Sequence, residues 1–478
     1  MAALTAIALT TLAIVAQDAT TLRAAPSASA ASHAQLWQGE LLEVRGSRLD
    51  HLQVYDHRRE RAGYVRASQV RVLSAGEAEA PQLLAVLRFL RDTPGAESLG
   101  IAYAAGYLKA APAGQITAEP FDALGVMAER LARRAGGKPA SATATAHLDV
   151  VAQYGVRFTS FERQGAMQLC YDGEAFRRVA AMAATSTAMA TPAQRARAAL
   201  ALTRHDCIDP VMPPHERQAL DRWRAQLLDS IEPATSAQID EVTLNRLRLR
   251  RAGVWAAIAF AQSRRAEVPQ AAAQRALDEL AAVDKRELGD DEQADYAEAA
   301  IRVGAVRWGA LPVAPVAGRL QIRLRSGEPG QTCVGVVDTT RPAMAPAAER
   351  CTHATVWAVS AAARADGRAL ALAVQPIEGW SELWVWRRRG DSWTLDVLPP
   401  AAAEPGLGYV EFAGWAPGAV PKLLLAREAR INGKATRRFE VLSTESLATD
   451  KFASTPQLLA AFGPWADPRW KRTTVSLR

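Results

Sequence analysis

The sequence predicts a multidomain protein of mixed α and β class, with a small N-terminal β-barrel, an all-α helical middle and a C-terminal antiparallel β part. Three observations support this order. Short segments within residues 41–72 alternate apolar and polar residues at a period of two, as half-buried strands do. Apolar residues at helical spacing follow from residue 81 to about 311. Strand-like segments separated by tight-turn sequences return after residue 318.

An apolar run over residues 4–15, ending near Ala16 and Ala19, precedes the barrel. Its length and composition are typical of the core of a secretory signal, and it is too short to span a membrane. We therefore expect a signal-like segment over residues 1–19. No Lys or Arg precedes the run, and the alternative is a buried first strand of the barrel.

The barrel is expected over residues 20–75. Its clearest strand segments are residues 41–44, 52–55, 63–65 and 69–72. Gly39 and Gly63 fall where the chain turns between strands, and glycine takes the positive backbone angle that a tight turn demands. Strands about ten residues apart are typical of a small barrel.

Residues 20–73 resemble the bacterial Src-homology-3 domain, a small barrel of cell-envelope proteins. The resemblance lies in Leu22-Arg23, Pro26-Ser27, the Gly39 turn and Gly63-Tyr64-Val65. It implies binding of cell-wall peptides or glycans, or a role as a spacer or docking module. Trp37, Tyr55 and Tyr64 are then candidates to line a ligand groove, which is thinner than usual because only Tyr55 of the family's aromatic pair is present. Alternatively, these rings fill the core of so small a barrel.

The helical middle is predicted over residues 80–311. Leu83, Val86, Leu87 and Leu90 share one helical face. Thr191-Pro192-Ala193-Gln194 has the residues of a capping box with proline at the first helical position. Further helices are expected near residues 96–110, 142–154, 174–184, 236–262, 269–285 and 291–308. We find no fixed repeat, so an irregular bundle and an irregular solenoid both stay open.

After a proline-containing linker at residues 312–318, the β-rich domain is predicted over residues 318–478. Asp366-Gly367 and Asn432-Gly433 favour tight hairpins. The segment from Phe412 to Gly418 is weakly similar to an element of periplasmic β-propeller blades. The domain is too short for a closed propeller of four or more blades. We expect propeller-like meanders or a β-sandwich.

The four cysteines form two local pairs in the sequence, and their even number leaves none over. We predict disulfides between Cys170 and Cys207 and between Cys333 and Cys351. Disulfides persist in oxidising compartments, which favours a periplasmic or otherwise exported protein. The alternative is four buried thiols in a reducing compartment.

The sequence has none of the common hydrolase, metallopeptidase or nucleotide-binding motifs. We therefore predict no cofactor, no metal site and no catalytic residue. The net charge of +7 is spread along 478 residues, whereas a nucleic-acid-binding protein gathers basic residues on one face, so we expect no nucleic-acid partner.

The leading interpretation is a non-catalytic binding or scaffolding protein of the cell envelope, whose barrel docks to peptidoglycan or to an envelope protein, without a transmembrane span in the mature chain. One alternative is a cell-wall hydrolase or other envelope enzyme with its site in the helical part. Its expected sign is a pocket joining two buried acidic groups, or a helix-lined cleft holding Asp240 and Glu241 or Glu174. Another is an inhibitor or assembly factor for a different envelope protein.

Overall fold

The computed structural model describes residues 11–73, 76–137, 141–163, 166–186, 188–231, 238–312, 319–340, 346–402 and 405–473. They form two compact units. The first spans Met1–Pro213 and Ile231–Ile239, and the second spans Pro214–Ser230 and Asp240–Arg478. The boundary therefore lies within the segment expected to be one helical domain. Residues 313–318 of the expected linker lie outside the described residues.

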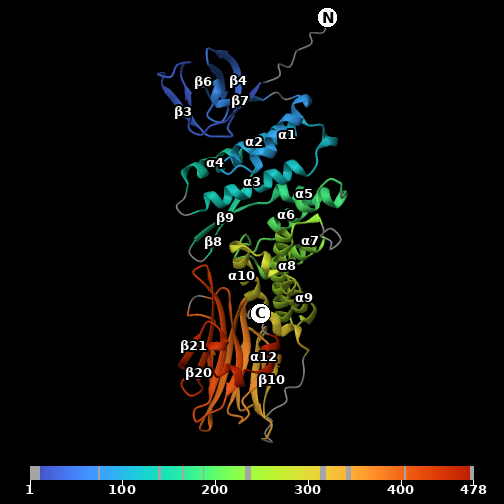
Figure 1. Ribbon diagram of the computed structural model, residues 1–478, viewed down its shortest axis with the longest axis vertical. Coiled ribbons are helices and arrows are strands. Elements are labelled where there is room, and N and C mark those ends of the chain that lie inside the picture. Colours follow the sequence, from blue (N-terminus) through green and yellow to red (C-terminus); the bar gives the residue numbers. More distant parts are fainter. Residues whose placement is uncertain are drawn as a thin grey trace. The chain divides into compact units, whose positions relative to one another are not determined.

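The first unit begins with a small antiparallel sheet (Figure 1). Its strands share one aliphatic core. Its strand order is β3-β2-β6-β5-β4-β1-β7. The strands are β1 (Leu12–Val15), β2 (Thr20–Arg23), β3 (Ser32–Leu36), β4 (Leu41–Arg48), β5 (His51–Asp56), β6 (Arg61–Arg66) and β7 (Val70–Leu73). The four strand segments expected from the alternation correspond to β4, β5, β6 and β7.

Strand β1 comes from the apolar run that we expected to be the core of a signal. It pairs with β4 and with β7, so residues 12–15 form a strand inside the sheet, the alternative that the sequence had left open. Ala13 and Val15 face the aliphatic core of the sheet, whereas Ile14 packs among the first helices. Because both faces of this strand are covered, its residues are continuously apolar. Residues 1–10 lie outside the described part of the chain.

Helices complete the first unit around α3. They are α1 (Ala80–Arg91), α2 (Glu97–Ala110), α3 (Glu119–Ala135), α4 (Ala142–Ala152), α5 (Glu174–Thr185) and α6 (Pro192–Leu202). The predicted capping box is present at the start of α6, with Thr191 and Gln194 each bonded to the other's backbone amide. One hairpin that the sequence analysis missed interrupts the helices, formed by β8 (Phe158–Arg163) and β9 (Ala166–Tyr171).

The Gly39 turn attaches the sheet to these helices. Tyr154 donates a hydrogen bond of 2.6 Å to the carbonyl oxygen of Gly39, and Ser98 donates one to that of Gln38. Gly39 has a positive φ of 93°, and a Cβ atom there would lie 2.5 Å from the Ser98 hydroxyl. Glycine is therefore required both by the backbone conformation and by this close approach.

The second unit contains the remaining long helices and the C-terminal strands. Its helices are α7 (Pro214–Asp229), α8 (Glu241–Arg264), α9 (Gln270–Ala281) and α10 (Asp290–Val306), followed by the 3₁₀ turn η6 (Arg307–Ala310). Small residues of α8, α9 and α10 form one core with Trp308, with the strand residue Ala373 and with Trp357, which directly follows a short strand. The helices and the sheets of this unit are thus parts of one packed body.

The strands of the second unit form stacked layers. The first layer is β10 (Leu320–Ser326), β11 (Thr332–Asp338) and β12 (Ala348–Thr352). The second contains β13 (Thr355–Val356), β14 (Ala362–Ala363), β15 (Ala369–Ile377), β16 (Trp380–Arg389) and β17 (Ser392–Leu398). The third contains β18 (Gly408–Ala416), β19 (Lys422–Ile431), β20 (Lys434–Ser443) and β21 (Thr449–Ala453).

Separate apolar clusters join each layer to the next. Val334 and Val336 of the first layer pack against Trp384 and Trp386 of the second. On the other face of the second layer, Leu383 and Val385 share a cluster with strands of the third. The outer face of the third is covered by α11 (Phe462–Trp465) and α12 (Pro468–Thr473). The second and third layers are one sheet, joined by a short parallel pairing of β16 with β18.

The predicted Asn432-Gly433 hairpin joins β19 to β20, and both residues have the positive φ angles that this turn needs, 49° and 79°. None of the helices in the described part of the chain combines the length and apolar character needed to cross a membrane.

Candidate anion-binding pocket

The candidate site is built around Arg307, the first residue of η6. Its guanidinium stacks on the ring of Trp308, with the central carbon 4.2 Å from the ring centroid. The residue is 2% exposed. It forms an ion pair with Glu411 of β18. The Nη1 atom makes this ion pair, while Nε and Nη2 have no acceptor among the described residues, and all three nitrogens are inaccessible to solvent. Buried donors are rarely left without partners, so Nε and Nη2 are exceptions to the usual pairing in this fold.

Close packing of α10 on β18 brings the Arg307 guanidinium to the carboxylate of Glu411. Gly304 lies against the ring of Tyr409, where a Cβ atom would be 2.7 Å from a ring carbon. Arg307 follows Gly304 by three residues, so both lie on one helical face. Glu411 follows Tyr409 by two residues, so both lie on one face of the strand. A side chain larger than glycine at position 304 would separate the two elements.

Glu411 is also held from its other side. Its Oε2 atom accepts a hydrogen bond of 2.7 Å from the indole nitrogen of Trp470 in α12. Both residues are buried, with exposures of 2% and 4%. The carboxylate is therefore fixed between η6 and α12, and it fixes Arg307 in turn. A buried charge pair of this kind needs such supporting contacts to offset the desolvation of both ions.

Arg307 lines a cavity of about 420 Å³. This volume lies within the usual range of small-molecule sites. The apolar lining residues are Leu277, Leu280, Ala281, Ala310 and Leu311, and the polar ones are Gln274, Asp278, Lys285, Tyr296, Arg307 and Arg472. Arg307 is buried, whereas Asp278, Lys285 and Arg472 are exposed and form the rim. The cavity thus combines three cations and one carboxylate with an apolar wall.

Two rim contacts position the charged side chains. The Lys285 ammonium lies 4.8 Å from the centroid of the Tyr296 ring, close enough for a cation–π interaction. Asp278 accepts a hydrogen bond of 2.8 Å from Gln274, one helical turn earlier on α9. The three cations therefore come from different elements: Lys285 from the turn after α9, Arg307 from η6 and Arg472 from α12.

The comparisons with known proteins do not identify the chain. No protein-family model matches it, and neither a curated protein nor a solved structure matches it significantly.

The three aromatic residues predicted to line a groove lie outside the core of the N-terminal sheet. That core is aliphatic, and all three rings are half-buried. Tyr55 and Tyr64 alternate with the core residues Val54 and Val65, so both face outward from β5 and β6. Trp37 lies in the turn that leads to Gly39. A ligand groove formed by these three rings stays a prediction.

Tyr55 is embedded in a charged surface. The Arg45 guanidinium lies 4.0 Å from its ring centroid, and the His57 ring lies 4.9 Å away. Glu43 accepts hydrogen bonds from both Arg45 and His57, which lower the pKa of its carboxyl. This outward face of the sheet therefore has both aromatic and charged groups available for contact.

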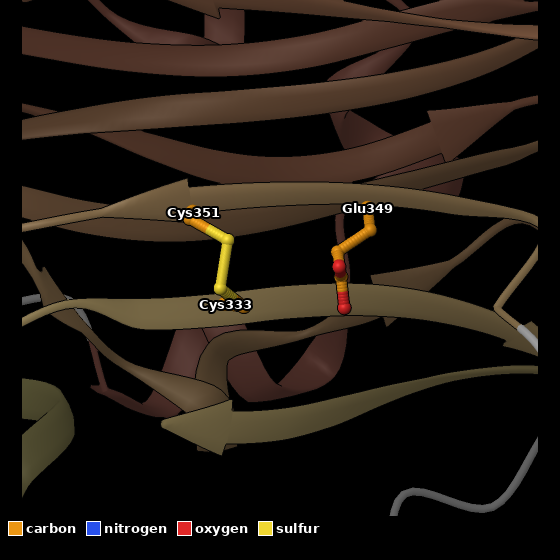
Figure 2. A group of neighbouring side chains, drawn as sticks. All are labelled: Cys333, Glu349 and Cys351. Carbon is orange, nitrogen blue, oxygen red and sulfur yellow. A yellow bond between two sulfur atoms is a disulfide. The ribbon is translucent and has the colours of Figure 1, made fainter. Parts of the chain in front are cut away.

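Both predicted disulfides are present. Cys170 of β9 is bonded to Cys207, and Cys333 of β11 is bonded to Cys351 of β12. Figure 2 shows the second bridge between the neighbouring strands, with Glu349 beside it. The three residues lie close enough to suggest a metal site. The sulfur atoms are bonded to each other, however, and Glu349 accepts a hydrogen bond of 2.8 Å from Arg325, so this oxidised form has no thiolate ligand to offer.

The acidic residues expected for an enzyme site are not brought together. Asp240 is the N-cap of α8 and accepts hydrogen bonds of 2.8 Å from the Thr243 amide and hydroxyl, which lower the pKa of its carboxyl. Glu241 pairs with Arg248. Glu174 belongs to the other compact unit and pairs with Arg177 and Arg178 on its own helix. Helix capping or an ion pair with a nearby arginine on the same helix therefore explains each of these three carboxylates.

The sequence analysis missed Arg307. Its one local signal is a charged residue directly after the apolar face of α10, where Ile301 and Ala305 are fully buried. Such a position predicts a buried charge with a specific partner. The partner could not be predicted, because Glu411 lies about a hundred residues later in the sequence.

Proposed function

We propose that the protein is a non-catalytic binding protein of the bacterial cell envelope, whose C-terminal unit holds a small anionic ligand in the Arg307 cavity. The observation that carries this proposal is the cavity lining, in which three cations, Lys285, Arg307 and Arg472, stand beside apolar residues. Lys285 and Arg472 at the rim add to the attraction for an anion.

The composition of the lining supports binding more than catalysis. Covalent or acid–base catalysis requires a nucleophile and a base within hydrogen-bonding reach of each other. The lining has one carboxyl, that of Asp278, and its hydrogen bond comes from an amide. Charge, shape and apolar surface are what the cavity supplies, and these are the properties of a binding site.

A second cavity of about 420 Å³ lies in the same unit, beside Phe439, Phe462 and Trp470. Its cations, Arg437 and Lys471, are both exposed. The Arg307 cavity is lined by three cations, Lys285, Arg307 and Arg472, whereas the second cavity is lined by two. We therefore assign the anion to the Arg307 cavity.

The two disulfides support the exported location in this proposal, since disulfides persist in oxidising compartments. The N-terminal sheet is the element that we propose to dock to peptidoglycan or to an envelope protein, through the outward face that carries Tyr55 and Tyr64. The Gly39 turn is already occupied by the helices of its own unit.

Anion binding is tested by calorimetric melting of the full protein with small anions, each compared with its uncharged amide. We expect an anion to raise the melting midpoint of wild type, because a ligand that binds only the folded state stabilises it. Ala281→Trp fills the cavity from an exposed helical position and should abolish this shift. Ala282→Trp, at the neighbouring exposed position outside the lining, should retain it. Equal shifts in both variants would refute the site.

Docking of the sheet is tested by sedimentation with isolated peptidoglycan. We expect wild type to bind and the double variant Tyr55→Ser/Tyr64→Ser to lose binding, because outward-facing rings supply most of the apolar contact on this face. Point changes are preferable to deletion of the sheet, since β1 and the Gly39 turn pack on the helices. Binding that is unchanged in the double variant would exclude this face, and no binding by wild type would direct the search to a protein partner.

A further inference from the structure

We infer that reduction of the Cys333–Cys351 bridge creates a zinc site on the first layer of strands, with Glu349 and His353 as the other two ligands. The disulfide form is the one that persists in an oxidising compartment, and the metal form requires a dithiol reductant. The bridge is thus a switch between a disulfide and a bound metal ion. This inference goes beyond the proposed anion binding and does not depend on it.

Three of the four donors lie together on one face of β11 and β12. Cys333 is paired directly with Cys351 in the ladder. Glu349 precedes Cys351 by two residues, and residues two apart on a strand share one face. The two Sγ atoms and a carboxylate oxygen of Glu349 all lie within 4.8 Å of one another (Figure 2). They are therefore close enough to share one ion.

His353 is the fourth donor. It is the first residue after β12, and its Nε2 atom lies 3.3 Å from the side-chain nitrogen of Gln331. Gln331 precedes Cys333 by two residues and His353 follows Cys351 by two, so these two side chains continue the row of opposed pairs. Glu349 and His353 are exposed, and Cys351 is half-buried, so this face is open to solvent at these positions.

The strands hold the donors in place without the bridge. Backbone pairing of β11 with β12 extends to both sides of the cysteines, over residues 332–336 of β11. On the opposite face of the layer, Val334 and Val336 pack in one cluster with Trp384 and Trp386. Reduction therefore breaks one S–S bond, while the ladder and the apolar contacts keep the two cysteines side by side.

The reduction is a thiol–disulfide exchange with a dithiol. A thiolate of the reductant attacks the Cys351 sulfur, because Cys351 is half-buried whereas Cys333 is 1% exposed. The S–S bond breaks with Cys333 as the leaving thiolate, and a mixed disulfide forms. The second thiol of the reductant displaces Cys351, so the reductant becomes a disulfide and the cysteines gain two electrons and two protons. Binding of Zn²⁺ then releases these protons, since thiolates are the ligands.

The donor set favours zinc. Two thiolates and an imidazole are ligands that Zn²⁺ prefers, and a carboxylate oxygen completes a tetrahedral set of four. Ca²⁺ and Mg²⁺ take oxygen ligands instead. Arg325 donates hydrogen bonds to both carboxylate oxygens of Glu349, each of which has a second lone pair for the metal. Arg325 thereby orients this carboxylate, as outer partners of metal ligands do.

The other bridge lacks this arrangement. In the part of the chain that the structure describes, Cys170 and Cys207 belong to no such cluster of three possible ligands. The Cys170–Cys207 pair is therefore the matched control for metal binding by reduced cysteines.

The test is titration of the full protein with Co²⁺, a spectroscopic substitute for Zn²⁺, after reduction by a phosphine under nitrogen and removal of the excess. We expect reduced wild type to bind one Co²⁺ per chain with thiolate-to-cobalt charge-transfer absorption, and Zn²⁺ to displace it. About two protons should be released per metal ion at pH 7. Oxidised wild type is the folded reference and should show no such absorption. Its absence in reduced wild type would overturn the inference.

Cysteine variants assign the metal to this bridge. Reduced Cys333→Ser/Cys351→Ser should lose the charge-transfer absorption, whereas reduced Cys170→Ser/Cys207→Ser should retain it. Absorption that survives Cys333→Ser/Cys351→Ser would place the metal at other cysteines and refute the site.

Two surface substitutions test the remaining ligands without removing a cysteine. Glu349→Gln and His353→Ala should each weaken Zn²⁺ binding at least about ten-fold, because each removes one of four ligands. Competition with a chromophoric chelator measures this affinity. His215→Ala, at an exposed histidine of α7, should leave it unchanged. If Glu349→Gln and His353→Ala both bind Zn²⁺ as tightly as wild type, the four-ligand site is wrong.

Discussion

Arg307 and Glu411 show how one buried ion pair ties a helical turn to a strand. Arg307→Met leaves the Glu411 carboxylate buried without its cation, and loss of one partner of such a pair costs about 3–5 kcal/mol. We expect urea unfolding to show this loss. The double variant Arg307→Met/Glu411→Gln should recover most of it, since the amide oxygen can still accept from Trp470. Equal destabilisation of the single and double variants would contradict this account.

Glu97 is the corresponding buried carboxylate of the first unit. Burial raises the pKa of Glu97, but hydrogen bonds from Arg130 and from the Gly95 amide, together with the charge of Arg134, outweigh burial and lower this pKa below its usual value of 4.5. Its ionised form therefore stabilises the fold above pH 4.5, and this contribution disappears as the pH falls through the lowered pKa.

Glu97→Gln should accordingly cost about 2 kcal/mol at pH 7, a figure reduced because both arginines are partly exposed to solvent. The difference in unfolding free energy between wild type and variant should shrink as the pH is lowered below 4.5. Urea titrations at pH 7 and pH 3 measure it. Glu267→Gln, which removes an exposed pairing with Arg265, is the matched control and should have a much smaller effect at pH 7. A difference that widens on acidification would show that the ionised form of Glu97 does not stabilise the fold.

At the scale of elements, the two disulfides are expected to differ in their effect. The Cys170–Cys207 bridge spans 37 residues and the Cys333–Cys351 bridge spans 18. In the chain-entropy model, their removal costs about 4 and about 3 kcal/mol, because the longer loop restricts the unfolded chain more. Paired Cys→Ser substitutions with urea unfolding compare them. If the shorter bridge proves the more stabilising, the entropy of the unfolded chain is not the main contribution of these disulfides to the free energy of unfolding.

The sequence predicted those elements that are determined by residues close together in the chain. Thr191 and Gln194 cap α6 as expected, and Asn432-Gly433 forms a hairpin, because neighbouring residues decide both features. Two other elements depend on distant contacts. Strand β1 is apolar because helices cover the face carrying Ile14, and β9 is a strand whose Cys170 is bonded to a residue beyond α6. The hairpin before α5 was missed for this reason.

The candidate site depends even more on distant contacts. Its cavity is lined by residues of α9, α10, η6 and α12, and its key carboxylate comes from β18. No sequence window contains more than a part of this set. The aromatic residues Tyr55 and Tyr64, by contrast, were singled out from a local resemblance, and the structure places both on one outward face of the sheet.

For the whole molecule, the two compact units predict two unfolding transitions. Each unit has its own apolar cores, and the helical middle is divided between them at the start of α7. Multidomain chains commonly depart from two-state unfolding for this reason. Differential scanning calorimetry of the full protein should therefore resolve two transitions. Each destabilising substitution should lower the transition of the unit in which it lies.

The assignment of these transitions tests the fold and the ligand site together. Cys170→Ser/Cys207→Ser should lower one transition, while Arg307→Met should lower the other, each by about 2–4 °C for every kcal/mol lost at this size. A small anion that binds in the Arg307 cavity should raise only the transition that Arg307→Met lowers, because a ligand stabilises the unit that binds it. A single transition moved by both sets of changes would mean that the units unfold as one. A ligand that raises the Cys170→Ser/Cys207→Ser-sensitive transition would place the anion in the first unit, away from Arg307.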